Sequence, residues 1–311
     1  MNTQQRIAVI IPCYNEEVAI SAVVRDFIAA LPEAKIYVFD NNSKDQTVIV
    51  ARNAGAIVYS VPLQGKGNVV RRMFADIDAD AYVLVDGDDT YHAPSARAMV
   101  KSLFENNLDM VVGRRVTEEI AAYRTGHRFG NWVLTEAVAR LFGRSFTDIL
   151  SGYRVFSRRF VKSFPALATG FEIETELTVH ALELRMSIDE IDSPYGSRPE
   201  GSVSKLNTYG DGFRILLTIL KLFRLERPLS FFGGIAAFFS LTSLMLSIPL
   251  FMTYSETGLV PRLPTAVFVT GMSLTAFLAL MSGFILDTVT RGRHEIKRLA
   301  YLQIAPPWTE N

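Results

Sequence analysis

The chain has 311 residues, with 32 basic and 32 acidic side chains and therefore no formal net charge at neutral pH. This length allows one domain of moderate size and a smaller appendage, and the balanced charge excludes a general nucleic-acid binder, which would need an excess of Lys and Arg. Cys13 is the single cysteine, so an intrachain disulfide framework is excluded. Near the N-terminus, the apolar run at residues 7–11 is too short for the apolar region of a signal peptide and is followed directly by Pro12.

Residues 1–209 alternate short apolar runs with stretches of helical spacing. The apolar runs predict buried strands at residues 6–11, 35–39, 56–60, 81–85 and 109–112. The spacing between them predicts helices at residues 17–30, 44–54, 67–78 and 94–106. Such alternation indicates an α/β domain with a parallel sheet covered by helices. Open sheets of this kind bind ligands beyond the carboxyl ends of their strands, so polar residues at those ends are candidates for a site.

Three acidic residues follow the fourth predicted strand. Asp86, Asp88 and Asp89 lie on the turn that begins directly after Val85. Two carboxylates one residue apart can share Mg²⁺ or Mn²⁺ with phosphate oxygens, and such a metal neutralises charge on a departing diphosphate. A solvated acidic turn is the alternative. The position directly after a buried strand favours a metal-binding pair made of Asp86 and Asp88.

Two further segments are candidates for binding anions. A Gly-Lys-Gly sequence centred on Lys66 precedes a predicted helix, where glycines permit close approach and the helix start offers amides and a positive dipole. Its spacing is not that of a P-loop, and a surface turn is the alternative. The second segment begins at Arg198, ends at Lys205 and is rich in Gly and Ser. It is either a linker or an anion-binding loop.

Two long uncharged stretches occupy the last third of the chain. Residues 231–253 and 265–286 contain no charged side chain, and a membrane span needs about 20 such residues. They predict two transmembrane helices joined by a short loop, with buried core helices as the alternative. The stretch at residues 213–223 combines an apolar face with basic residues. It predicts a helix lying in the membrane interface, or else an amphipathic helix packed on the soluble domain.

The charges around the two spans predict their orientation. Basic residues precede the first span and follow the second, whereas the connecting loop carries one Arg and one Glu. The positive-inside bias therefore places the N-terminal domain and both termini in the cytoplasm, and the chain in the cytoplasmic membrane as a multi-pass protein. The expected parts are a catalytic domain at residues 1–209, an interfacial helix at 210–228, two spans within 229–290 and a cytoplasmic tail at 291–311.

Over residues 6–210, the motifs taken in order resemble family 2 glycosyltransferases with a GT-A (Rossmann-like) fold, and more closely the polyprenyl-phosphate sugar synthases. The terminal pair of spans is similar to the membrane anchors of several members. The matching motifs are P-x-Y-N-E at residues 12–16, the acid Asp40, D-x-D at 86–88, G-x-R ending at Arg115, Arg128 before Asn131, D-x-x-S-G-Y-R at 148–154 and R…S-K at 198–205.

The resemblance implies roles for single residues. The residues expected to bind the donor are Pro12, Tyr14, Glu16, Asp40, Asp86 and Asp88, together with Lys66 from the glycine-rich turn. The metal is expected at Asp86 and Asp88. Binding of the acceptor phosphate is expected of Arg115, Arg128, Arg198 and Lys205. The expected catalytic set is Asp86, Asp88, Arg115, Arg128, Asp148 and Arg198.

The chain departs from the family pattern at three places. Asn41 stands where the family usually has a second acid after Asp40. Thr90 stands where some members have a Gln near the metal pair. The basic segment has one extra residue before Lys205, so its register is shifted.

The resemblance implies metal-dependent, inverting transfer of a sugar from a nucleotide sugar to undecaprenyl or dolichyl phosphate at a lipid surface. A UDP-sugar is favoured as donor, and GDP-mannose is the alternative. A lipid phosphate is already anionic, so no general base is required. Two other functions stay open: transfer to a hydroxyl of a lipid-linked saccharide, with Asp148 or another acid as base, and a non-catalytic membrane scaffold. Assembly as a homo-oligomer is compatible with the sequence.

Overall fold

The structure is a computed structural model that describes residues 5–116, 147–201, 217 and 219–306. By its internal contacts the chain divides into two units. The first unit comprises residues 1–219 and 296–311, and the second comprises residues 220–295. Of the residues expected in a site, Arg128 and Lys205 lie outside the described residues.

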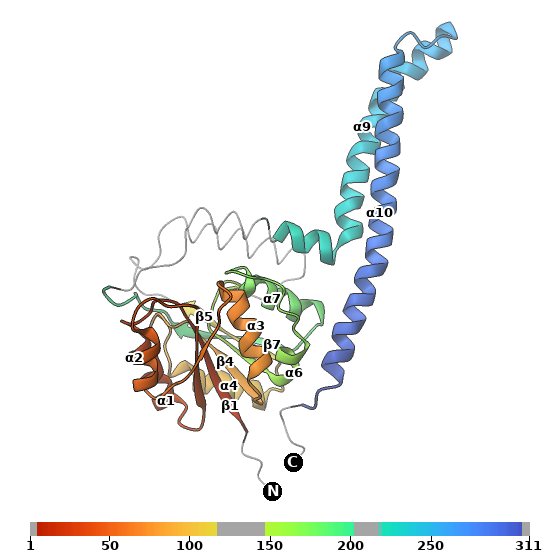
Figure 1. The fold of residues 1–311 in the computed structure, drawn as a ribbon. Helices are drawn as coiled ribbons and strands as arrows, with labels where there is room; N and C mark the ends of the chain where they lie inside the picture. Colours follow the sequence, from red (N-terminus) through yellow and green to blue (C-terminus); the bar gives the residue numbers. More distant parts are fainter. Residues whose placement is uncertain (1–4, 117–146, 202–216, 218, 307–311) are drawn as a thin grey trace. The chain divides into compact units, whose positions relative to one another are not determined.

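The first unit is built on a seven-stranded sheet (Figure 1). Its strands are β1 (Ile7–Cys13), β2 (Lys35–Asp40), β3 (Ile57–Ser60), β4 (Ala81–Leu84), β5 (Met110–Val116), β6 (Arg154–Ser157) and β7 (Ile188–Pro194). Their order in space is β3-β2-β1-β4-β6-β5-β7. The five strands expected from the sequence are confirmed as β1 to β5. The expectation of a wholly parallel sheet is wrong, because β6 inserts between β4 and β5 and runs antiparallel to both.

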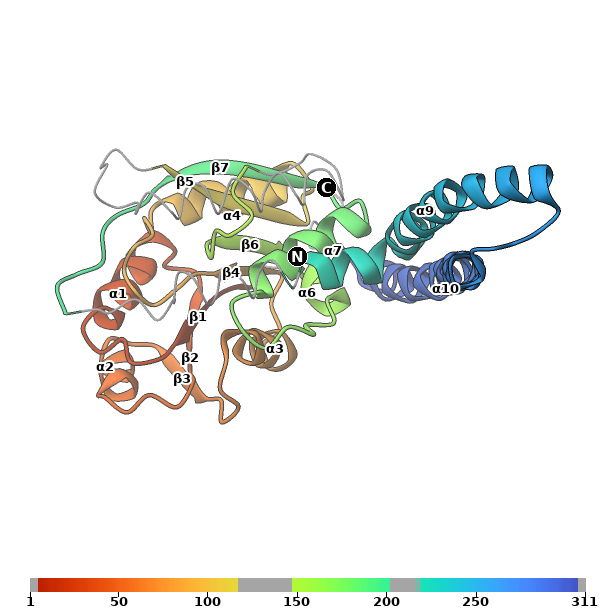
Figure 2. The same cartoon turned by 90° about the horizontal axis from the view of Figure 1, so that it is seen from above.

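Helices cover both faces of this sheet (Figure 2). One face carries α1 (Ile20–Ala30), α2 (Thr47–Asn53) and α4 (Ser95–Glu105), and the other carries α3 (Lys66–Asp76), α6 (Arg158–Ser163) and α7 (Ile173–Glu183). Side chains of β1 alternate between the two hydrophobic clusters: Val9 and Ile11 face α1 and α4, and Ile10 faces α3 and α7. Since both faces are covered, β1 is apolar throughout its length.

The order of the strands determines where the sheet receives a ligand. The chain runs outward from β1 to β2 and β3, then returns to place β4 on the other side of β1. The carboxyl ends of β1 and β4 are therefore neighbours at the point where the strand order reverses. Open α/β sheets bind ligands at such a point. Because β5 and β7 run in the same direction as β4, their carboxyl ends point toward this edge too.

The second unit consists mainly of two long apolar helices, α9 (Pro228–Thr257) and α10 (Leu263–Leu302), the second of which continues into the first unit. Both are long and apolar enough to cross a membrane. Ser243 Oγ lies 2.7 Å from Ser273 Oγ, and the helices also approach closely at Gly283, where an added Cβ would press against Phe232. Small residues at a helix crossing let the two backbones come close, as in membrane helix pairs.

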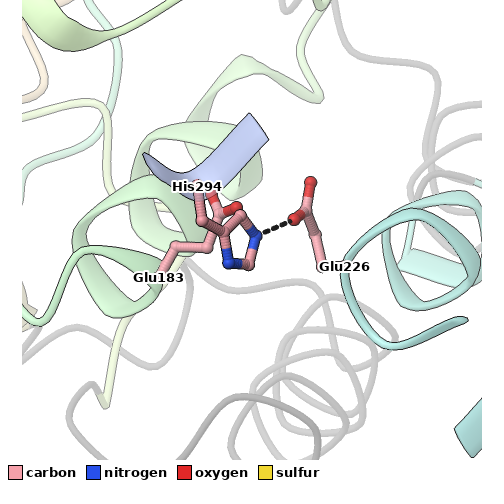
Figure 3. A group of neighbouring side chains, drawn as sticks. All are labelled: Glu183, Glu226 and His294. Atoms are coloured by element: carbon pink, nitrogen blue, oxygen red, sulfur yellow. Dashed lines mark hydrogen bonds and ion pairs between the residues drawn. The ribbon is translucent and has the colours of Figure 1, made fainter. Parts of the chain in front are cut away.

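Before α9, residues 219–226 are helical and overlap the expected interfacial helix, whose earlier part lies outside the described residues. This short stretch is tied to α10 within the second unit. Thr290 Oγ1 donates to the carbonyl of Leu225 over 2.8 Å. His294 Nε2 lies 2.8 Å from Glu226 Oε2 (Figure 3). These contacts fix the turn between the stretch and α9.

The last residues of α10 belong to the first unit. Tyr301 Oη donates to Asp109 Oδ2 over 2.9 Å, at the start of β5. Lys297 Nζ pairs with Glu183 Oε2 over 2.7 Å, at the end of α7. Residues 296–302 are therefore a structural part of the α/β unit, rather than a separate tail.

We expect Tyr301→Phe to lower the stability of the α/β unit by ~1 kcal/mol or more, because it removes a hydroxyl donor to the buried carboxylate of Asp109. Thermal unfolding of the purified protein in detergent measures the effect. Tyr254→Phe, which removes an exposed hydroxyl from α9, is the matched control. Equal unfolding temperatures for the two variants would show that the Tyr301 contact does not stabilise the unit.

Candidate functional site

The loops that follow β1 and β2 are bound to each other. Asn15 adopts a left-handed backbone with φ 52°, and its side-chain oxygen accepts from the N–H of Lys44 over 2.8 Å. The N–H of Asn15 donates to Ser43 Oγ over 2.9 Å, and the N–H of Glu16 donates to Thr47 Oγ1 over 2.8 Å. The P-x-Y-N-E segment is therefore held at the carboxyl end of β2, beside Asp40.

Asp40 ends β2 with a buried carboxylate. Its Oδ2 accepts from the N–H of Ser43 over 3.2 Å. Its Oδ1 is buried and has no hydrogen-bond partner among the described residues. A buried oxygen without a donor costs free energy, so Asp40 would gain from an N–H or O–H supplied by a ligand.

Asn41, which departs from the family pattern, has a structural role that an acid cannot fill. Its Nδ2 donates to the carbonyls of Val61 and Leu63 over 3.0 and 2.7 Å. Its Oδ1 accepts from the N–H of Gly65 over 2.7 Å. An aspartate would lack the two donated bonds. Asn41 thus fixes the loop that leads to Lys66.

Lys66 begins α3 and reaches the acidic turn after β4. Its Nζ lies 2.5 Å from Asp86 Oδ1 and 2.5 Å from Glu174 Oε1. Only 9 % of the Lys66 side chain is exposed, so burial opposes its charge. The two carboxylates outweigh that effect and raise the pKa of Lys66 above its usual value. The ammonium group is therefore charged at neutral pH.

Asp88 is more deeply buried than Asp86. Its Oδ1 accepts from Thr90 Oγ1 over 2.6 Å, and its Oδ2 pairs with Arg198 Nη2 over 2.5 Å. Burial, followed by the charge of Asp86, raises the pKa of Asp88, while Arg198 acts in the opposite direction. Neighbouring carboxylates that repel each other are stabilised by a shared cation. Carboxylate oxygens are also the ligands that Mg²⁺ and Mn²⁺ prefer, so the residues present fit the expected metal.

Arg115 and Asp148 form a bidentate pair at the ends of β5 and the loop before β6. Arg115 Nε lies 2.7 Å from Asp148 Oδ2, and Arg115 Nη2 lies 2.7 Å from Asp148 Oδ1. The guanidinium also lies over the ring of Tyr195, 5.5 Å from its centre. Burial disfavours the charged form of Asp148, but the hydrogen bonds from Arg115 hold its pKa below the usual value.

Arg154, the last residue of the D-x-x-S-G-Y-R motif, is fully buried. It donates to the carbonyls of Ile149 and Ser151 over 2.6 and 2.9 Å, and to Thr178 Oγ1 over 2.8 Å. Burial lowers its pKa to about 10, so it is still charged at neutral pH. Arg154 therefore holds the backbone of the loop before β6 and is not placed to bind an anion.

Two residues at this edge belong to none of the sequence motifs and were not predicted. Tyr91 Oη accepts from the N–H of Gly152 over 2.9 Å, beside Asp86. Glu174 is the second partner of Lys66 and comes from α7. The structure thus joins the expected residues in pairs: Lys66 with Asp86, Arg198 with Asp88, and Arg115 with Asp148.

The sequence of this chain is similar to those of known glycosyltransferases. Residues 8–164 match the family described as Glycosyl transferase family 2. The chain is similar to glycosyltransferase AglJ of Haloferax volcanii, with 31% identity over 97% of this chain and 100% of that protein. It is also similar to a dolichyl-phosphate hexose transferase of Haloferax volcanii, with 28% identity over 71% of this chain and 95% of that protein.

A solved structure shares the fold and a modest identity. Glucosyl-3-phosphoglycerate synthase from Mycobacterium tuberculosis, in complex with Mn²⁺, UDP-glucose and phosphoglyceric acid, is 26% identical with a TM-score of 0.57. The match covers 70% of this chain and 80% of that one.

We expect Gly152→Ala to weaken Mn²⁺ binding by ~10-fold or more without unfolding the protein, because the added Cβ would overlap Asp86 Oδ2 and displace a carboxylate that is expected to bind the metal. Titration of Mn²⁺ in the presence of UDP, followed by thermal shift, measures the effect. Gly196→Ala is the control, since its Cβ would meet only the carbonyl of Thr90 at 4.0 Å. Equal Mn²⁺ binding by both variants would rule out a role for Asp86 in holding the metal.

Proposed function

The chain belongs to glycosyl transferase family 2, and on this premise we propose that it transfers a sugar from a UDP-sugar to a polyprenyl phosphate. The observation that carries the proposal is the gathering of two acids and two bases, Asp86, Asp88, Lys66 and Arg198, where the strand order reverses. The two long apolar helices of the same chain support a lipid acceptor. The named activity of the dolichyl-phosphate hexose transferase relative supports it too.

The donor is assigned to the edge formed by β1, β2 and β4. Asp86 and Asp88 would hold Mg²⁺ or Mn²⁺, which when bound stabilises the negative charge of the leaving diphosphate. Asp40 would accept a hydrogen bond from the nucleotide base, because its buried Oδ1 has no hydrogen-bond partner in the described part of the chain. Pro12 near the end of β1, and Tyr14 and Glu16 in the loop that follows it, would line the nucleoside. Lys66 contributes a fixed positive charge next to Asp86.

Asp148 favours a phosphate acceptor over a hydroxyl acceptor. A hydroxyl must lose its proton to a general base as it attacks, whereas a lipid phosphate is already an anion. Both carboxylate oxygens of Asp148 accept hydrogen bonds from Arg115, which keep its pKa low. A carboxylate held in this way is a poor proton acceptor. The reaction then requires mainly that two anions are placed in line and that the leaving charge is stabilised.

The acceptor phosphate is assigned to arginines on the same edge. Arg198 pairs with Asp88, so its guanidinium lies beside the proposed metal-binding pair. A guanidinium binds a phosphate with two parallel hydrogen bonds, which reduces repulsion between the acceptor and the donor diphosphate. Arg115, and the residues Arg128 and Lys205 from outside the described residues, complete the proposed acceptor set.

A transfer assay with purified protein tests the proposal. The labelled donor is UDP-glucose, UDP-N-acetylglucosamine or GDP-mannose, and the two matched acceptors are polyprenyl phosphate and polyprenol. We expect an acid-labile labelled lipid from the phosphate alone. Asp88→Ala should reduce the rate by ~10²-fold or more, because it removes a ligand of the cation that would stabilise the leaving charge. Excess EDTA should abolish transfer. Transfer to polyprenol, or an acid-stable product on a lipid-linked saccharide, would contradict the phosphate acceptor.

We also propose that the α/β unit lies in the cytoplasm and that the loop between α9 and α10 lies on the opposite side of the membrane. The distribution of basic residues around the spans supports this orientation. A Thr257→Cys variant without Cys13 should react with an impermeant thiol reagent on intact cells. Lys101→Cys, on the exposed side of α4, should react only after permeabilisation. The reverse pattern would overturn the orientation.

A further inference from the structure

Glu174 closes a bridge of three charged groups, in which Lys66 and Glu174 are largely buried and Asp86 is partly exposed. Its Oε1 lies 2.5 Å from Lys66 Nζ, which lies 2.5 Å from Asp86 Oδ1 as well. The side chain of Glu174 is only 6 % exposed, and its Oε2 has no hydrogen-bond partner among the described residues. A buried carboxylate is costly unless a cation compensates it, so Glu174 depends on Lys66.

The fold holds the two ends of this bridge in fixed positions. The N–H of Gly67 donates to the carbonyl of Thr169 over 3.1 Å, and a Cβ on Gly67 would overlap the carbonyl of Ala168. Glu176 accepts from the N–H groups of Leu167 and Ala168 over 3.0 and 2.7 Å. The start of α3, which carries Lys66, is therefore packed against the segment that leads into α7.

The charge of the bridge bears on metal binding. One ammonium and two carboxylates give a net charge of −1. Without the Glu174 charge, the same bridge would be neutral, and the buried ammonium of Lys66 would have Asp86 as its only counter-charge in the bridge. A divalent cation would then compete directly with Lys66 for the Asp86 carboxylate. With Glu174 present, Lys66 is neutralised from the other side.

We propose that Glu174 is a positioning residue that holds Lys66 at the start of α3 and keeps the Asp86 carboxylate available to the divalent cation. This inference rests on the proposed metal-dependent transfer. Glu174 acts through Lys66 and touches neither donor nor acceptor. A change at Glu174 should therefore alter the Mn²⁺ concentration that the protein requires, and should affect the rate of transfer only as a consequence.

Thermal-shift titration with Mn²⁺ alone, without donor or acceptor, tests the inference. Glu174→Gln makes the bridge neutral, and we expect the Mn²⁺ concentration for half-maximal stabilisation to rise by ~10-fold. The double variant Lys66→Met with Glu174→Gln has the original net charge of −1, and its half-maximal concentration should return toward the wild-type value. Lys66→Met alone has a net charge of −2 and should bind Mn²⁺ at least as tightly as the wild type.

Glu176→Gln is the matched control, because it removes an acid from the same helix that binds backbone N–H groups and makes no contact with Lys66. It should lower the unfolding temperature and leave the Mn²⁺ requirement unchanged. An unchanged requirement in Glu174→Gln, or an equal weakening in Glu176→Gln, would overturn the inference. If Glu174→Gln does not fold, Lys66→Met and the double variant must have the same Mn²⁺ requirement, because Glu174 has no effect once Lys66 is absent, and a clear difference between the two would overturn the inference.

The two proposals fail separately. If the wild type makes no lipid product but the Mn²⁺ order of the variants holds, the acceptor assignment is wrong and the role of Glu174 stands. If lipid product forms and the Mn²⁺ order is absent, the role of Glu174 is wrong and the transfer stands.

Discussion

Repulsion between buried carboxylates is the constraint on which the site depends. Asp86, Asp88 and Glu174 gather at one edge of the sheet, where burial disfavours the charged forms of Asp88 and Glu174. The protein offsets this repulsion with Lys66 and Arg198, each within ion-pair distance of an acid. The cations balance the acids only in part, and the remaining negative charge suits a divalent cation that arrives with a diphosphate.

The fold concentrates these charges by a simple rule of topology. Because β4 returns to the far side of β1, the carboxyl ends of both strands are neighbours, and the carboxyl ends of β2, β5 and β7 point toward the same edge. Neutral residues then hold the charged ones in place: Asn41 fixes the loop before Lys66, and Tyr91 binds the backbone of Gly152 beside Asp86.

The sequence predicts this edge well because strand ends and motif residues are local features. Asp40, Asp86 and Asp88 follow apolar runs, and the runs mark the strands. The antiparallel strand β6 could not be predicted, since its direction depends on pairing with β4 and β5. The contacts of Arg154 and Glu174 could not be predicted for the same reason. Arg154 binds backbone carbonyls and Glu174 binds a lysine that is distant in the sequence. Before the fold is known, both residues look like surface charges.

A crystal of the protein grown with Mn²⁺ and UDP tests the central claim most directly, because the anomalous signal of manganese locates the ion without reference to activity. We expect one strong peak at coordination distance from an Asp88 oxygen, next to the diphosphate of UDP and beside Asp86. A diphosphate bound at this edge without manganese at Asp88, or manganese bound at another part of the chain, would contradict it.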